Sequence, residues 1–260
     1  MSIPIYQVDA FAERAFGGNP AAVCPLETWL PDAVMQAIAA ENNLSETAFF
    51  VPRGDDYDLR WFTPGVEVDL CGHATLGSAW VIFNRLAPER SVVRFHTRSG
   101  VLTVKRDGDG LAMDLPANPP KPCDDAPGLV EALGAAPAEV LTTRDHFVAV
   151  FPTQAAVRDL TPDFGRLATL DRWAVMATAP GDEVDFVSRF FAPRKGVPED
   201  PVTGSAHCVL TPFWAARLGR DELSARQISR RGGSLRCRLL GDRVELVGRV
   251  APYMQGTIDI

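Results

Sequence analysis

Two short segments of the chain combine small residues with one polar group that could take part in catalysis. Residues 71–75 contain His73, and residues 200–206 contain Asp200. An imidazole and a carboxylate can each donate or accept a proton or a hydrogen bond from a substrate. The small residues beside them would let an anionic group approach the backbone closely. They are Gly72, Ala74, Gly204 and Ser205.

A third candidate is Glu46, whose neighbours in residues 44–50 are mostly apolar or small. Apolar surroundings disfavour the charged form of a carboxyl group, which suits it to exchanging a proton with a substrate. An exposed strand residue would fit the same sequence equally well. The glycines near His73 and Asp200 could likewise serve only a tight strand-to-helix turn. The remaining histidines are expected to be structural: His96, His146 and His207.

The surroundings of the two polar segments are repeated in the chain. Arg-Trp-Phe-Thr-Pro at residues 60–64 precedes the first segment, and Arg-Phe-Phe-Ala-Pro at residues 189–193 precedes the second. The similarity resumes downstream, where residues 95–104 align with residues 228–237. A period of about half the chain is too long for a solenoid and predicts two similar domains that face each other. Small-molecule sites tend to lie in clefts between domains, so the repeat favours a site there.

Each copy predicts the same order of elements. A helix over residues 74–86 or 204–218 follows the polar segment, and both helices are apolar on nearly all faces, which places them in a core. Pro212 should kink the second helix. The expected strands of the two copies, with an outer helix at 31–41, lie at residues 44–51, 57–63, 92–97, 101–106, 111–115 and 185–191 and near residues 227, 235 and 244. The predicted fold class is α+β, with two similar domains, each a barrel-like, mostly antiparallel sheet wrapped around a buried central helix.

A proline-rich segment separates the two copies. Four prolines within residues 116–122 should not continue a helix or a sheet, because proline lacks the amide donor and fixes φ. The predicted first domain is therefore residues 1–117, and a C-terminal strand near residues 251–260 could return to it. The predicted second domain is residues 126–250.

The composition narrows the class of protein. A net charge of −7 without a basic stretch argues against nucleic acid as a partner. The five cysteines form no Cys-x-x-Cys pair, which argues against a disulfide framework and against a zinc site. No signal peptide is visible at the N-terminus, and no apolar run approaches the ~20 residues of a membrane span. These features predict a cytoplasmic protein without membrane contact.

Four segments resemble the signature segments of the PhzF-like (phenazine biosynthesis-like) isomerases, in the same order and over nearly the whole chain. They are residues 16–20, 44–50, 69–75 and 199–206. That family shares the diaminopimelate epimerase fold, with two similar domains and a site in the cleft between them. The resemblance implies a cofactor-independent isomerase that moves a proton on a small carboxylated metabolite, and it implies a homodimer.

The resemblance also implies roles for individual residues. Glu46 matches the carboxylate that carries the proton, and His73 and Asp200 match supporting polar residues. Substrate contacts are expected from the small residues at the two helix starts and from a segment that lines the cleft. These residues are Asn19, Gly72, Gly204 and Ser205. No metal ligand is expected.

One departure from the epimerases of this fold leaves a second function open. Those enzymes use two thiols, and this chain has Cys71 at the first thiol position but Pro201 at the second. Cys208 lies too far along its helix to replace it. An epimerase or racemase would therefore need Cys71 together with a carboxylate, either Glu46 or Asp200. A non-catalytic binding homologue is the third possibility, whereas a nucleotide enzyme is disfavoured because no G-x-G-x-x-G loop occurs.

Overall fold

The computed structural model describes residues 2–260, and the chain divides into two compact units. The first unit runs up to Leu115 and also takes in Val247–Ile260, and the second unit is Pro116–Leu246. The division falls at the start of the proline-rich segment. The domain limits expected from the sequence stay a prediction, since compactness alone does not show that a unit folds by itself.

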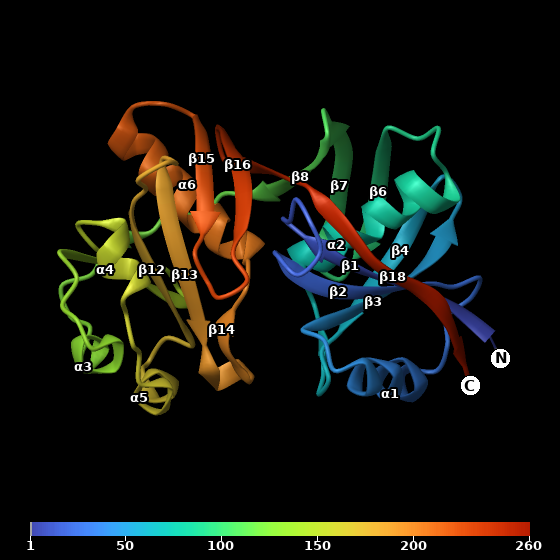
Figure 1. Cartoon of the computed structure of the whole chain (residues 1–260), viewed down its shortest axis with the longest axis horizontal. Helices are drawn as coiled ribbons and strands as arrows, with labels where there is room; N and C mark the ends of the chain where they lie inside the picture. The colour runs from blue at the N-terminus through green and yellow to red at the C-terminus, as the bar shows by residue number, and fades with distance from the viewer. Residues whose placement is uncertain (1) are drawn as a thin grey trace. The chain divides into compact units, whose positions relative to one another are not determined.

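The first unit is a mostly antiparallel sheet with one helix inside it and one outside it (Figure 1). Its strands are β1 (Ser2–Ala10), β2 (Asn19–Pro25), β3 (Glu46–Arg53), β4 (Asp56–Phe62), β5 (Glu67–Val68), β6 (Val92–Thr97), β7 (Gly100–Asp107), β8 (Gly110–Pro116) and β18 (Val250–Asp259). Its helices are α1 (Asp32–Asn42) and α2 (Gly72–Val81), and α2 continues into a single π-helical turn, Ile82–Leu86. The C-terminal strand β18 returns to the first unit and pairs antiparallel with β1.

The central helix α2 is buried, as its apolar sequence predicts. It packs against β1, β2 and β3, and each of its residues from His73 to Ala79 is buried. A side chain at Gly77 would start only 2.8 Å from a methyl group of Val8, so a glycine is needed where α2 crosses β1. The expected helix over residues 74–86 is confirmed, with its last turn wound as a π-helix.

The outer helix α1 covers the other face of the same sheet. Met35 and Ile38 of α1 pack in one cluster with Phe49 of β3 and Phe62 of β4. The strand β3 is therefore covered on both faces, by α1 and by α2. Burial on both faces explains its continuous apolar run at residues 48–51, which lacks the alternation of a half-exposed strand. This double packing fixes the position of the strand at whose start Glu46 lies.

The second unit repeats this arrangement. Its strands are β9 (Lys121–Pro122), β10 (Glu139–Thr142), β11 (His146–Val150), β12 (Ala174–Pro180), β13 (Phe186–Ala192), β14 (Val197–Asp200), β15 (Glu222–Gln227), β16 (Gly233–Leu240) and β17 (Arg243–Gly248). Parallel pairs occur at equivalent places, β2 with β3 and β4 with β6 in the first unit, β11 with β12 and β13 with β15 in the second. Antiparallel pairs also match, β1 with β2 and β3 with β4 in the first unit, β12 with β13 and β15 with β16 in the second. The duplication seen in the sequence is therefore a duplication of topology.

The helices of the second unit include the expected central helix and three that the sequence analysis did not predict. They are α3 (Leu129–Leu133), α4 (Gln154–Arg158), α5 (Phe164–Thr169) and α6 (Gly204–Leu218), with a short 3₁₀ turn at Pro193–Lys195. The helix α6 has the predicted bounds and contains Pro212. The helices α3, α4 and α5 pack in one cluster with β11 and β12, as α1 packs on the first unit's sheet.

One expectation for the proline-rich segment is wrong. Lys121 and Pro122 form the short strand β9, which pairs antiparallel with β10. Proline is tolerated in such a strand when its missing N–H does not face the partner strand. Among residues 2–260, no helix is both long enough and apolar enough to cross a membrane.

Candidate active site

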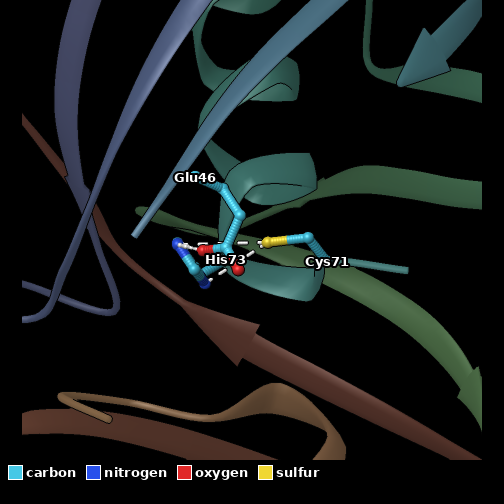
Figure 2. A group of neighbouring side chains, drawn as sticks. All are labelled: Glu46, Cys71 and His73. Atoms are coloured by element: carbon cyan, nitrogen blue, oxygen red, sulfur yellow. Dashed lines mark hydrogen bonds and ion pairs between the residues drawn. The ribbon is translucent and has the colours of Figure 1, made fainter. Parts of the chain in front are cut away.

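Three side chains that could do chemistry meet in the first unit. Glu46, Cys71 and His73 point toward one another in Figure 2. Glu46 begins β3, Cys71 is the residue that precedes α2, and His73 is the second residue of α2. His73 Nε2 lies 3.1 Å from Glu46 Oε2, and Cys71 Sγ lies 3.5 Å from His73 Nδ1. The packing of α2 on β3 thus brings together residues 27 positions apart in the sequence.

Asn19 supports the histidine from its other side. Its Nδ2 lies 3.2 Å from His73 Nδ1, and the Ser45 hydroxyl donates to its Oδ1 at 3.4 Å. Gly18 has φ of +59°, and a Cβ there would collide with the carbonyl oxygen of Ala10. Only glycine lets the chain turn sharply enough to place Asn19 at the start of β2. The side-chain amide of Asn19 offers both a donor and an acceptor, so it can match either protonation state of Nδ1.

The Glu46 carboxylate is largely shielded, and one of its oxygens accepts no aligned hydrogen bond from the described residues. The side chain of Glu46 is 19% exposed and that of His73 is 7% exposed. Glu46 Oε2 is buried and accepts no hydrogen bond within residues 2–260. His73 Nε2 is within ion-pair distance of it, but the two groups are not aligned as a hydrogen bond. A buried oxygen without an aligned donor is able to accept a proton from a bound molecule.

Burial and charge set the protonation of Cys71 and His73. Burial raises the pKa of the Cys71 thiol to about 11, and the Glu46 charge acts in the same direction. Burial alone would lower the pKa of His73, but Cys71 and Glu46 hold that pKa well above its ordinary value. Because the thiol stays protonated near pH 7, the carboxylate is the neighbour that favours a proton on His73.

Both buried helices begin at a glycine and lack a side-chain cap. The helix α2 begins at Gly72 after Cys71, and α6 begins at Gly204 after Thr203. In neither case does the preceding side chain accept a hydrogen bond from the helix. The first amides of a helix have no partner within it and carry the positive end of its dipole. Each helix start could therefore hold an anionic group such as a carboxylate.

Asp200 belongs to a second polar group, at the start of α6. The Thr203 hydroxyl donates to the Asp200 carboxylate. The side chain of Gln227 accepts from the Thr203 backbone N–H at 2.9 Å and donates to the Asp200 carbonyl oxygen at 2.7 Å. Gln227 is fully buried, so these bonds hold the turn between β14 and α6 in one conformation. Ser205, the second residue of α6, is exposed.

The functional residues predicted from the sequence fall into two groups, one in each unit. Four lie around the start of α2 in the first unit: Asn19, Glu46, Gly72 and His73. Three lie around the start of α6 in the second unit: Asp200, Gly204 and Ser205. The roles given to these seven residues stay predictions.

His146 lies in β11, and His207 lies one turn into α6. His207 Nδ1 donates to the Thr203 carbonyl at 2.8 Å, and its ring packs against Phe186. His146 contacts the Thr143 hydroxyl and packs against aromatic rings. Burial lowers the pKa of both His146 and His207 to about 4. These two rings are therefore neutral near pH 7.

Gln227 was not among the residues predicted from the sequence, although a weak signal exists. Leu223, Ala225 and Gln227 occupy alternate, buried positions of β15. A polar side chain that continues an inward-facing apolar series must find hydrogen-bond partners in the interior. The sequence marks Gln227 as such a residue but does not identify its partners.

Comparison with known proteins places these features in a family. The family model described as phenazine biosynthesis-like protein, PhzC-PhzF, matches residues 8–256. The chain is 56% identical over 260 residues to an uncharacterized isomerase of Pseudomonas aeruginosa, with 100% of each chain covered.

Solved structures agree with this assignment. A phenazine biosynthesis protein of the PhzF family from Enterococcus faecalis superposes with a TM-score of 0.97 at 47% identity, covering 100% of each chain. A hydroxyproline epimerase from Agrobacterium vitis superposes with a TM-score of 0.63 at 12% identity, covering 99% of this chain and 91% of the epimerase. That second similarity concerns the fold alone, and it agrees with the predicted diaminopimelate epimerase-like architecture. By sequence and by fold, the chain belongs to the PhzC-PhzF family of phenazine biosynthesis-like proteins.

Proposed function

We propose that this protein is an isomerase that moves a proton between carbon atoms of a small carboxylated metabolite, with Glu46 as the proton carrier. Similar proteins are named isomerases, which supports the reaction class. The observation that carries the proposal is the state of Glu46 Oε2. This oxygen is buried, lies beside His73 and has no aligned donor within residues 2–260.

The chemistry needs only a base that returns its proton. The Glu46 carboxylate, whose side chain is 19% exposed, removes an acidic C–H proton, and the electron pair of that bond moves into the conjugated system of the substrate. The protonated Glu46 then delivers the proton to another carbon, and the double bond shifts. Nothing is oxidised or reduced, so atoms and electrons balance without a further reagent. His73, positioned by Asn19, stabilises the ionised form of Glu46 before the first step.

The positive helix starts would bind the substrate carboxylate. Gly72 and Gly204 allow close approach, and the Ser205 hydroxyl is free to turn toward a ligand because it is exposed. We also propose that Asp200 and Ser205 act on the same substrate as Glu46, in a cleft between the two domains. That proposal rests on the internal repeat and on the family resemblance, as does the proposal of a homodimer.

Two other functions remain candidates. Cys71 lies beside His73, which favours an epimerase that uses this thiol with a carboxylate. A thiol with a pKa of about 11 is almost entirely protonated near pH 7, and this weighs against it as the base. A binding protein without turnover would keep the fold but would have no need of a shielded carboxylate oxygen that lacks an aligned donor.

Solvent exchange in D₂O tests the proposal without a known substrate. The protein is incubated with a panel of amino acids, hydroxy acids and cyclic dienyl carboxylates, and ¹H NMR follows the loss of C–H signals. Deuterium at a second carbon, with a shifted double bond, supports the isomerase. Exchange confined to the α-carbon, with loss of optical rotation, supports the epimerase.

Variants of two glutamates then assign the base. We expect Glu46→Gln to slow exchange by about 10²–10⁴-fold, because an amide cannot accept and return a proton. Glu41→Gln, at an exposed position of α1, should leave the rate unchanged. Exchange by the Glu46 variant at the wild-type rate would refute the mechanism. Ligand-induced shifts without any exchange would indicate the binding protein.

A further inference from the structure

We propose that Glu46, Cys71 and His73 form a binding site for a zinc-like divalent metal ion. The three residues offer one ligand atom each, a carboxylate oxygen, a thiol sulfur and an imidazole nitrogen, and these atoms lie within 4.8 Å of one another. Oxygen, sulfur and nitrogen together are a ligand set that zinc and cobalt accept. The binding itself does not depend on the proposed isomerase function.

Two of the three separations between ligand atoms can be compared with those of a tetrahedral site. Zinc bonds of about 2.3 Å to sulfur and about 2.0–2.1 Å to nitrogen would separate those two atoms by about 3.5 Å. The corresponding separation of nitrogen and oxygen is about 3.3 Å. In the structure, Cys71 Sγ lies 4.0 Å from His73 Nε2, and Glu46 Oε2 lies 3.1 Å from the same nitrogen. Cys71 Sγ lies nearer to His73 Nδ1, at 3.5 Å, so the Cys71 side chain must turn toward Nε2 to complete the site.

Two further observations point to a ligand. Glu46 Oε2 is buried and accepts no aligned hydrogen bond from the described part of the chain, so coordination would replace only its ion pair with His73. His73 is more than nine-tenths buried, and Asn19 lies against its Nδ1. A histidine that binds a metal through one nitrogen usually donates the other N–H to a neighbouring acceptor. The Asn19 amide can provide that acceptor by presenting its oxygen, and Ser45 can bond either end of the amide.

The protonated state of Cys71 does not prevent binding. A metal ion displaces the proton of a coordinating thiol, and it must also displace the proton that the raised pKa of His73 keeps on Nε2, so binding releases both protons to solvent. Three protein ligands leave the fourth position of a tetrahedral ion for water or for a ligand.

Metal binding and the proposed proton transfer exclude each other. The lone pair of Glu46 Oε2 that coordinates an ion cannot also accept a proton from a substrate. The metal site would thus inhibit the proposed isomerase reversibly, and this consequence, unlike the binding, rests on the proposed function.

The arrangement also explains why cysteine spacing does not reveal the site. The sequence contains no Cys-x-x-Cys pair, and that absence argues against a zinc site built from paired cysteines. Here the sulfur comes from one cysteine, the nitrogen lies two residues later, and the oxygen comes from β3. Only the packing of α2 against β3 assembles the three.

Cobalt titration of the tag-free, chelator-treated protein tests the proposal. Co²⁺ bound to a thiolate gives a charge-transfer band in the near ultraviolet. We expect wild-type protein to develop this band at one equivalent of Co²⁺ and to lose it when Zn²⁺ is added. Cys71→Ser should lack the band, whereas Cys123→Ser, which removes a cysteine of the second unit, should keep it. Asn19→Ala should bind Co²⁺ about 10–100-fold more weakly, as losses of such supporting groups do.

Zinc-edge X-ray absorption provides a reading that needs no variant. The zinc-loaded wild-type protein should show one sulfur at about 2.3 Å and otherwise nitrogen or oxygen neighbours. The proposal is overturned if wild-type protein shows no charge-transfer band, if the band survives Cys71→Ser, or if the absorption spectrum contains no sulfur neighbour. Because none of these measurements uses a substrate, failure here leaves the solvent-exchange test of the isomerase unaffected.

Discussion

The two units share a topology but place different chemistry at the start of the central helix. In the first unit the start of α2 is surrounded by titratable groups, Glu46, Cys71 and His73. In the second unit the start of α6 is fixed by neutral groups, the Thr203 hydroxyl and the Gln227 amide, around one carboxylate. Two units with the same arrangement of strands and helices can therefore carry different functional groups. The first start has groups that can exchange a proton, whereas the second is built as a rigid turn.

Both units contain an equivalent ion pair between an arginine and a glutamate. Arg60 forms a two-bond ion pair with Glu67, at 2.6 and 2.8 Å, and the equivalent Arg189 forms one with Glu199, at 2.7 and 3.0 Å. Each pair ties a strand to the segment that leads into the buried helix. The repeat has thus preserved the groups that position the helix start while the groups at the start diverged.

The buried histidines of the two units respond to pH in opposite directions. The folded-state pKa of His73 is raised above its unfolded value of about 6.5. Its stabilising contribution is complete below pH 6.5 and is lost as pH rises through the folded-state pKa. His146 and His207 have folded-state pKa values of about 4. Their contribution is present above pH 6.5 and is lost as pH falls through 4.

The largest expected effect is therefore acid destabilisation of the second unit. A pKa difference of about 2.5 corresponds to about 3 kcal/mol for each of His146 and His207. His207→Asn keeps a donor near the Thr203 carbonyl oxygen but does not titrate. We expect its free energy of unfolding, from urea titrations followed by circular dichroism, to fall less between pH 6.5 and pH 4 than that of wild type. If the free energy of unfolding of the two proteins fell equally between pH 6.5 and pH 4, protonation of His207 would not contribute to the acid destabilisation.

The next effect concerns the reactivity of Cys71. With a pKa of about 11, its thiolate fraction at pH 8 should be on the order of 10²-fold below that of an ordinary thiol. Iodoacetamide should therefore modify the partly exposed Cys123 first, as mass spectrometry of the digested protein would show. If Cys71 reacted as fast as Cys123, the first unit would hold an activated thiol, and the epimerase function would gain support.

A comparable effect is expected at Gln227. Replacement by leucine leaves the Thr203 N–H and the Asp200 carbonyl oxygen without their buried partner, so we expect a loss of about 2–4 kcal/mol. Gln255→Leu, at an exposed position of β18, should change the free energy of unfolding by less than about 0.5 kcal/mol. Equal stability of the two variants, measured by urea unfolding, would show that the turn before α6 does not depend on Gln227.

The smallest expected effect is a difference in stability between variants of the two equivalent arginines. Arg189 donates to Glu199 and also to the carbonyl oxygens of Val157, Arg158 and Leu160. Arg60 has only carboxylate partners among its hydrogen bonds to the described residues, and one of them, Asp32, is largely exposed. Arg189→Lys should therefore cost about 1–2 kcal/mol and Arg60→Lys about 1 kcal/mol or less, because lysine cannot form the two-bond pair. The opposite order in thermal unfolding would contradict this comparison.

The buried helices, the matching topology of the two units and the family could be predicted from the sequence. The apolar stretches at residues 74–86 and 204–218 predicted the two buried helices because a helix without a polar face must lie in a core. The repeat predicted matching topologies, and four local segments identified the family. Such features are readable because they depend on neighbours in the chain or on a pattern of period 2 or 3.6.

What the sequence could not supply is the set of contacts between distant segments. The position of Glu46 beside His73 depends on the packing of α2 against β3. The hydrogen bond from Gln227 to the Asp200 carbonyl oxygen depends on the pairing of β15 with β13. The sequence marked Glu46 and His73 as candidates, but it left open whether the Cys71 thiol takes part in an epimerase reaction. Burial raises the pKa of this thiol to about 11, which favours a neutral thiol at pH 7, and burial is a property of the folded chain. Side-chain chemistry and local periodicity are therefore determined residue by residue, whereas distances and protonation states follow only once tertiary packing has excluded water.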